Sequence, residues 1–400
     1  MGESPRLELA EILRRFGPAF RERHHGHLPQ RHLRVLWDLE HCRTPALGGH
    51  LYQCDQCGVQ QVVYNSCGNR HCPKCQSLDK ERWQEKRSAE LLPVQYFHVV
   101  FTLPEELNPL IWRNQELLYN LLFRCASQTL LRIGADPKHL GARLGFLAVL
   151  HTWSQKLTEH PHVHCIVPGG GISPDGQQWI SCRPDFFLPV RVLGRLFRGL
   201  FLDQLRQLYR ADKLLFPGQI EALKEPQSFQ ALLDSLYGKE WVVYSKPPFD
   251  GPERVLRYLA RYTHRVAISN SRLVRLEDDQ VIFTYKDYAQ EGRVKEMPLA
   301  ANEFLRRFLL HVLPDRFVRI RYYGFLANRC REQRLALCRK LLKEGAPAPP
   351  RCRESWSELV QRLTGRDPTL CPQCQQGHLS ALRLVPPERP PPRSGRELTW

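Results

Sequence analysis

Two apolar runs near the middle of the chain constrain its fold more than any other feature. Residues 145–153 read GFLAVLHTW, residues 162–169 read HVHCIVPG, and a short polar link joins them. Two strand-like runs with so short a connection predict a β-hairpin. Their AVL and CIV segments are typical of a protein core, so we expect this hairpin to lie at the centre of a sheet.

Histidines occupy alternate positions at the start of the second run. Because residues i and i+2 of a strand point to the same face, His162 and His164 project together and offer half of a metal site. A His-x-His pair alone is more often part of a solvated strand face, but the central position of this strand favours metal binding. The hairpin also offers Gln155 and His151 on the antiparallel side. We expect Gln155 as the third ligand, with His160 as the second choice.

Two tyrosines provide a candidate nucleophile. The segment RYLARYTHR reads as a helix, and its spacing places Tyr258 and Tyr262 on one face, about one turn apart. Packed aromatic residues are the alternative interpretation. Arg257, Arg261 and Arg265 surround the two phenols, so a phosphate can approach them. A tyrosine hydroxyl is a weak nucleophile, and a divalent ion on the histidine pair would polarise the phosphorus as a Lewis acid.

The charge of the chain indicates a polyanionic partner. The 400 residues carry a net charge of +17, and residues 254–340 contain 19 lysines and arginines against 9 acidic residues. Such a run is usually a solvated face. Here the arginines alternate with aromatic residues, as in RFVRIRYYGF, which favours a groove that binds phosphates and stacks bases, with Arg319 and Arg321 as candidate contacts. No apolar run approaches the ~20 residues of a membrane span, and we expect an intracellular, soluble protein.

Cysteine spacing predicts a zinc site near the N-terminus. Cys54 and Cys57 form one CxxC knuckle, Cys72 and Cys75 form a second one, and 14 residues separate the two. Two such pairs indicate one tetrahedral Zn²⁺ with four thiolates and a structural role. Nearby residues offer substitutes or a second site, namely Cys42, His50, Cys67 and His71.

A further CxxC pair lies near the other end of the chain. Cys371 and Cys374 have no partner in their own neighbourhood unless Cys352 or His378 completes a site, so the pair stays unassigned. The sequence that follows position 375 is rich in proline, and we expect it to be disordered.

Taken together, the motifs resemble those of the two-tyrosine HUH transposases of rolling-circle insertion sequences. The resemblance covers roughly residues 40–335, in the order of that family. It is carried by YNSCGNRHCPKCQ, FHVVFTLP, HTWSQ, HPHVHCIVPGGG, KPPFDGPERVLRYLARYTHRVAISN and RIRYYGFLANRCR.

The resemblance implies a set of roles. His162 and His164 would hold Mg²⁺ or Mn²⁺, although imidazole ligands suit transition metals better than Mg²⁺. Tyr258 and Tyr262 would cut single-stranded transposon ends and transfer them to target DNA through 5′-phosphotyrosine intermediates. A replication initiator or relaxase with the same chemistry is one alternative, and a non-catalytic zinc-dependent DNA-binding regulator is another. The location implied is the bacterial cytoplasm, in association with the nucleoid.

The implied fold is of the α+β class. We expect an HUH endonuclease-type central antiparallel sheet with flanking helices, preceded by a small zinc-binding domain. Residues 1–92 would form the N-terminal helix and the zinc-binding recognition domain, and residues 93–345 the nuclease domain. Residues 346–400 would form the CxxC segment and the disordered tail.

Overall fold

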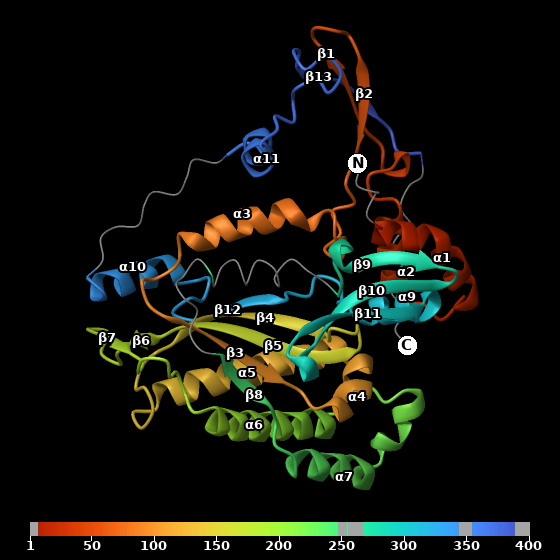
Figure 1. Cartoon of the computed structure of the whole chain (residues 1–400). Helices are drawn as coiled ribbons and strands as arrows, with labels where there is room; N and C mark the ends of the chain where they lie inside the picture. The colour runs from red at the N-terminus through yellow and green to blue at the C-terminus, as the bar shows by residue number, and fades with distance from the viewer. Residues whose placement is uncertain (1–6, 247–253, 255–266, 344–353, 389–400) are drawn as a thin grey trace.

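A five-stranded antiparallel sheet forms the centre of the molecule in the computed structural model (Figure 1), which describes residues 7–246, 254, 267–343 and 354–388. The predicted hairpin is confirmed as β4 (Gly145–Trp153) and β5 (Glu159–Pro168). β3 (Tyr96–Thr102) pairs with the other side of β5, and β8 (Val243–Lys246) forms one edge. The mixed fold with a central antiparallel sheet is therefore the one expected.

The opposite edge of the sheet corrects one expectation. The Arg-rich region 302–345 reads as helical in the sequence, but β12 (Ile320–Gly324) lies within it and pairs with β4. The helix α9 (Ala301–Leu310) ends before Pro314, and α10 (Arg331–Leu341) begins only after the strand. The aromatic IRYYG segment fits a pleated, half-buried position, which the count of arginines alone did not reveal.

One face of the sheet packs against helices and forms the main core. The helices on the sheet are α4 (Asn108–Arg113), α5 (Gln115–Ala135) and α6 (Val190–Arg210), and α7 (Pro226–Tyr237) packs on α6 on the side away from the sheet. Side chains alternate along β5, so Val163, Cys165 and Val167 all point into this core. Residues 104–134 read as one long helix in the sequence, but the structure interrupts it at Asn114. The side chain of Asn114 donates to the backbone oxygen of Leu215 at 2.9 Å and accepts from its N–H at 2.8 Å.

The other face of the sheet carries the histidines. A small apolar cluster of Tyr96, Leu147, Val149 and Ile166 covers part of this face, and Trp83 of α3 (Gln76–Ser88) packs on it. Figure 1 shows α3 on the side of the sheet opposite α5 and α6. The two faces therefore differ in kind, one being a dry core and the other a partly covered polar surface.

A second core joins segments that are far apart in the sequence. The N-terminal helices α1 (Leu9–Arg23) and α2 (Gln30–Glu40) pack with α9 and with the sheet of β9 (Leu273–Glu277), β10 (Gln280–Asp287) and β11 (Arg293–Ala300). Leu157, in the turn between β4 and β5, is fully buried in this core. The N-terminal helices thus contact the part of the chain assigned to the nuclease.

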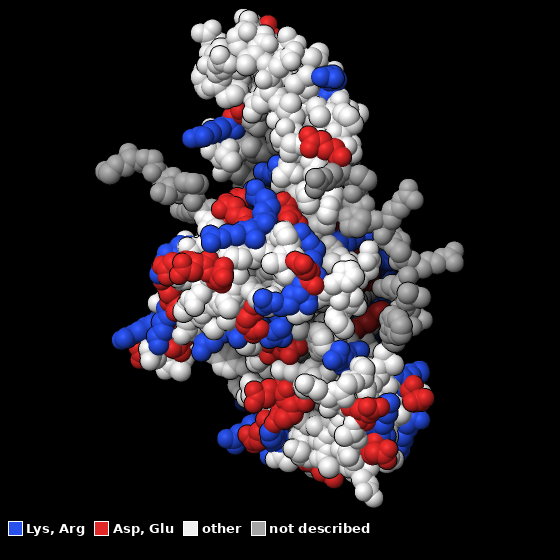
Figure 2. Space-filling model, turned by 90° about the vertical axis from the view of Figure 1, so that its right-hand side faces the viewer, with Lys and Arg blue, Asp and Glu red and all other residues white. Residues whose placement is uncertain are grey.

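A third unit is a lobe that we call the ribbon lobe, defined by residues 48–64 and 367–388. It contains the three-stranded sheet of β1 (Gly49–Cys54), β2 (Gln60–Tyr64) and β13 (Leu379–Val385), in the order β13-β1-β2. The expectation of disorder after position 375 is wrong for β13, because its backbone pairs with β1. Figure 2 shows that the lobe at the top carries few charged side chains on the face in view.

Shorter elements complete the described chain. They are β6 (Gly170–Ile172), β7 (Trp179–Ser181), α11 (Trp356–Thr364) and the 3-10 turns η1 (Pro45–Leu47), η2 (Glu105–Leu107), η3 (Gly218–Lys224), η4 (Asn270–Arg272) and η5 (Tyr288–Gln290). Among the described residues, no helix combines the length and the apolar character needed to cross a membrane.

Candidate metal centre and cysteine clusters

Three histidines converge on the sheet face opposite α5 and α6. The register pairs His151 of β4 with His162 of β5, and His164 follows two residues later on the same face. Their ring nitrogens lie within 4.8 Å of one another, and all three side chains are buried. Three imidazoles on one side of a cation leave coordination positions open for a substrate, which is typical of catalytic rather than structural metal sites.

Gln155, the expected third ligand, lies elsewhere. β4 ends at Trp153, and the side-chain oxygen of Gln155 accepts a hydrogen bond from the backbone N–H of Lys286, at 3.4 Å. The exposed His160 also lies outside the cluster. His151 is the third residue of the cluster, because the antiparallel register places it directly opposite His162. The hairpin in the sequence carried this signal, since the register follows from the position of the turn.

Hydrogen bonds orient two of the three imidazoles. Nδ1 of His162 lies 2.5 Å from the carbonyl oxygen of His160, to which it donates. Nδ1 of His164 lies 2.6 Å from Nε2 of His98, and the two rings are stacked with 5° between their planes. Partners of this kind fix the tautomer of a metal ligand, and with the proton on Nδ1 it is Nε2 that would bind a cation. Sequence reasoning missed His98, although its position in β3 places it on the same face.

The buried position of His162 keeps its imidazole neutral. Burial lowers the pKa of His162 to about 3, with a smaller contribution from His160. Neutral imidazole is the form that binds a metal, so no proton has to leave His162 near pH 7.

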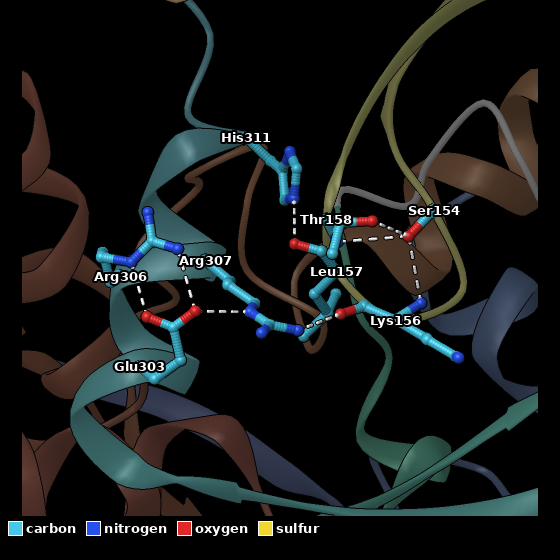
Figure 3. A network of polar contacts seen from close by, with 8 residues as sticks. All are labelled: Ser154, Lys156, Leu157, Thr158, Glu303, Arg306, Arg307 and His311. Atoms are coloured by element: carbon cyan, nitrogen blue, oxygen red, sulfur yellow. Dashed lines mark hydrogen bonds and ion pairs between the residues drawn. The ribbon is translucent and has the colours of Figure 1, made fainter. Parts of the chain in front are cut away.

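A network of polar contacts holds the turn between β4 and β5 against α9 (Figure 3). Arg307, paired with Glu303, donates to the backbone oxygen of Lys156 at 3.1 Å. Nε2 of His311 donates to the backbone oxygen of Leu157 at 3.1 Å, which leaves its Nδ1 to accept from the hydroxyl of Thr152, also at 3.1 Å. Thr152 adjoins His151, so α9 supports the strand that carries a metal ligand.

One cysteine cluster lies beside the N-terminal helices. It consists of Cys42, Cys67, Cys72 and Cys75, whose sulfurs lie 3.5 to 3.7 Å from their neighbours. A tetrahedral Zn²⁺ with ~2.3 Å bonds to sulfur separates its ligands by about 3.8 Å, and the distances here are close to that value.

The remaining N-terminal knuckle belongs to a different cluster. Cys54 and Cys57 lie with Cys371 and Cys374 in the ribbon lobe. Joining Cys54, Cys57, Cys72 and Cys75 into one site, as the spacing predicted, was therefore wrong. The hairpin of β1 and β2 separates the two knuckles in space, and each finds its partners elsewhere.

Two of the predicted DNA contacts, Arg319 and Arg321, interact with other residues of the protein. Arg319 is buried, and burial lowers its pKa to about 10 with a further contribution from Arg70. Arg321 donates to the side chain of Asn120 at 2.5 Å and lies 4.1 Å from the ring of Phe123. Arg319 therefore does not reach the surface as a phosphate contact, and Arg321 is held by its neighbours. The predicted nucleophiles and their arginines lie outside the described residues, namely Tyr258, Tyr262, Arg257, Arg261 and Arg265.

Two segments of the chain match families of known proteins. Residues 145–334 match the family model described as "Putative transposase", and residues 12–103 match the "Transposase zinc-binding domain". "Putative transposase y4qJ" of Sinorhizobium fredii is 54% identical over 96% of this chain and 97% of its own length. The transposase for insertion sequence element IS801 of Pseudomonas savastanoi pv. phaseolicola is 30% identical over 83% of this chain and 79% of its own.

A solved structure also matches at a low level. The conjugative relaxase TrwC in complex with oriT DNA, in its metal-bound form, has a TM-score of 0.25 and 16% identity, over 42% of this chain and 71% of that one. A likeness this low bears on neither function nor site.

An antiparallel sheet that presents a His-x-His metal pair, together with a preceding zinc-binding region, defines the class of HUH-type transposases. Within that class, the chain belongs to the family of rolling-circle transposases of IS91-type insertion sequences. It is therefore an enzyme that acts on DNA.

Proposed function

We propose that the protein cuts and rejoins single-stranded transposon ends at the centre formed by His151, His162 and His164. The convergence of three buried imidazoles on one face of the sheet carries this proposal. A DNA-binding regulator without catalysis has no use for such a centre. The observation also fits a replication initiator, but membership of the transposase family favours transposition.

The chain's own residues would perform each step. The divalent cation that the centre would hold, Mg²⁺ or Mn²⁺, supplies a Lewis acid at the scissile phosphate. The donor set fits Mn²⁺ better, because imidazole prefers transition metals. The phenolic oxygen of Tyr258 or Tyr262 would attack phosphorus, the bond to the 3′ oxygen would break, and that oxygen would take up a proton. Attack by a 3′ hydroxyl on the phosphotyrosine reverses the exchange, so no nucleotide cofactor is needed.

We further propose a division of labour along the chain. The zinc-binding part, expected over residues 1–92, would select the transposon ends, and residues 93–345 would cut them, with residues 346–400 as the C-terminal part. The packing of α1 and α2 on α9 supports a rigid connection between selection and cutting. Structural Zn²⁺ in the cluster of Cys42, Cys67, Cys72 and Cys75 would hold the recognition part in shape.

A cleft beside the edge strand β8 supports a path for the DNA backbone. It has a volume of about 390 Å³, and Arg191 and Arg195 of α6 line it together with Trp241. Both arginines are exposed, whereas Trp241 is buried against Phe197 and Phe201. The cleft therefore offers charge for phosphate contacts rather than a surface for base stacking.

Denaturing electrophoresis with end-labelled single-stranded DNA tests the proposed reaction. We expect a covalent adduct that depends on a divalent metal, maps to Tyr258 or Tyr262, and disappears in the double Phe variant. His162→Ala with His164→Ala should abolish the adduct and spare DNA binding, whereas the exposed His139→Ala should change neither. An adduct that forms in excess chelator, or that persists in the double Phe variant, would refute the mechanism.

A further inference from the structure

We propose that Cys371 and Cys374 complete a second four-cysteine zinc site with Cys54 and Cys57, and that this ion joins the two distant parts of the chain in the ribbon lobe. The sulfur of Cys54 lies 3.7 Å from that of Cys374, and the sulfur of Cys57 lies 3.8 Å from that of Cys371. These distances equal the ~3.8 Å edge of a tetrahedral zinc–sulfur site. They are far longer than the ~2.05 Å of a disulfide.

Both knuckles have the same backbone geometry. In the first, the N–H of Gly58 donates to the oxygen of Cys54 at 3.2 Å, and in the second, that of Gln375 donates to Cys371 at 3.0 Å. Gly58 and Gln375, which follow the second cysteine of each pair, have left-handed φ values of 70° and 55°. Two matching turns that face each other with their sulfurs inward form an arrangement ready for one tetrahedral ion.

Backbone N–H groups point at the sulfurs. The N–H of Gln56 donates to the sulfur of Cys54, and that of Gly377 donates to the sulfur of Cys374, each at 3.4 Å. Bonds of this kind favour the thiolate form that zinc requires. A Cβ atom at Gly377 would lie 2.5 Å from the sulfur of Cys54, so only glycine allows the two knuckles to approach this closely.

The surrounding sheet brings the distant halves into register. β1 pairs with β13 from Gly49 opposite Val385 to Cys54 opposite Leu379. Beyond the end of the strands, Asp55 and His378 exchange hydrogen bonds of 3.1 and 2.8 Å. Cys57 and Cys371 are 314 positions apart in the sequence, yet the pairing of β1 with β13 brings the two knuckles together.

The ribbon lobe has little apolar core of its own. β2 is exposed along most of its length, and so is β13, with Leu384 showing 71% of its surface. A sheet that buries so little apolar surface needs another source of stability, and a metal is the usual one in small units. The zinc-binding family model ends at residue 103, so it includes only one half of this second site.

Metal analysis of the purified full-length protein tests the proposal independently of any cleavage assay. We expect two zinc ions per chain in the wild type and one in Cys374→Ser. Cys374→His should keep two, because imidazole can replace a thiolate at zinc. Cys330→Ser is the matched control, since Cys330 lies in neither cluster, and it should keep two.

Hydrogen exchange shows which part of the protein loses stability when the second zinc ion is absent. In Cys374→Ser, the amides of β13 should exchange faster, whereas those of β4 and β5 should not change. One zinc per chain in the wild type would overturn the proposal. Two zinc ions in the double variant Cys371→Ser with Cys374→Ser would overturn it as well.

Discussion

His98 illustrates how a residue can affect the metal centre without touching the ion. Its Nε2 lies 2.6 Å from Nδ1 of His164, and both rings are buried. When a metal occupies Nε2 of His164, the proton of that neutral ring is on Nδ1, so His164 donates and His98 accepts. His98 is therefore a positioning residue for the ligand.

We expect His98→Ala to raise the metal concentration needed for half-maximal cleavage by about 10- to 100-fold. The rate at saturating metal should change much less, because the ligands themselves are intact. His98→Gln keeps an acceptor in the side chain and should recover part of the affinity. Titration of cleavage with Mn²⁺ measures both effects, and an unchanged requirement in His98→Ala would contradict the role.

Three residues of the hairpin, His151, Gln155 and His160, can be compared as candidates for the third metal ligand. His151→Ala should abolish cleavage at ordinary metal concentrations, since it removes one of three ligands. Gln155→Ala and His160→Ala should retain it, because both side chains lie outside the cluster. Metal titration of the three variants in parallel provides the measurement. If Gln155→Ala were the most impaired, the turn would have to move toward the metal in the active state.

The buried His311 should lower the free energy of unfolding of the protein in acid. Burial lowers its pKa from 6.5 to about 4, so the unfolded chain binds a proton more readily than the native protein does between these values. Stability from this group is complete above pH 6.5 and falls as the pH drops toward 4, by about 3 kcal/mol at most. Urea unfolding between pH 4 and 7 should show this slope. Because neighbouring histidines also contribute, His311→Gln should make it shallower without removing it.

At the scale of elements, the sequence predicted local pairings better than distant ones. The β4–β5 hairpin was predictable because its two strands and their turn are contiguous, and alternation then placed His162 and His164 on one face. β12, β13 and the joining of Cys54 and Cys57 with Cys371 and Cys374 were not, because these pairings connect segments far apart in the sequence. Cys42 and Cys67 lie near Cys72 and Cys75 in the sequence, but spacing alone did not favour them over Cys54 and Cys57. His151 was present in the motif, but choosing it over Gln155 required the register of the hairpin.

The cleft beside α6 predicts a contribution to DNA binding. Arg191→Ala with Arg195→Ala should weaken binding of single-stranded DNA of any sequence. The slope of log affinity against log salt should become shallower by about 0.7 for each lost contact. Fluorescence anisotropy at several salt concentrations measures it. Arg132→Ala with Lys138→Ala removes the same charge from exposed positions elsewhere, so an equal effect of both pairs would assign the loss to net charge alone.

At the scale of the whole molecule, the second core joins the N-terminal helices to the β4–β5 turn, and would thereby link the proposed recognition part to the proposed cutting part. Ile12 of α1 is fully buried in the same cluster as Leu157, next to the metal hairpin. We expect Ile12→Ala to destabilise this core by about 2–5 kcal/mol. Faster hydrogen exchange should follow in α9 and in the turn at residues 154–158. The exposed Arg14→Ala is the control, and exchange confined to α1 would show that the two parts are not coupled.

The split ribbon lobe also has a consequence in time. During synthesis, Cys54 and Cys57 leave the ribosome long before Cys371 and Cys374. Cys371 is 314 positions after Cys57. Until then β1 lacks its β13 partner, and the proposed second ion has only two of its four thiolates. A gene copy interrupted by a stop codon or a frameshift before Cys371 would encode the histidine centre but never a complete lobe. Assembly of the lobe would thus show that translation has continued past Cys374.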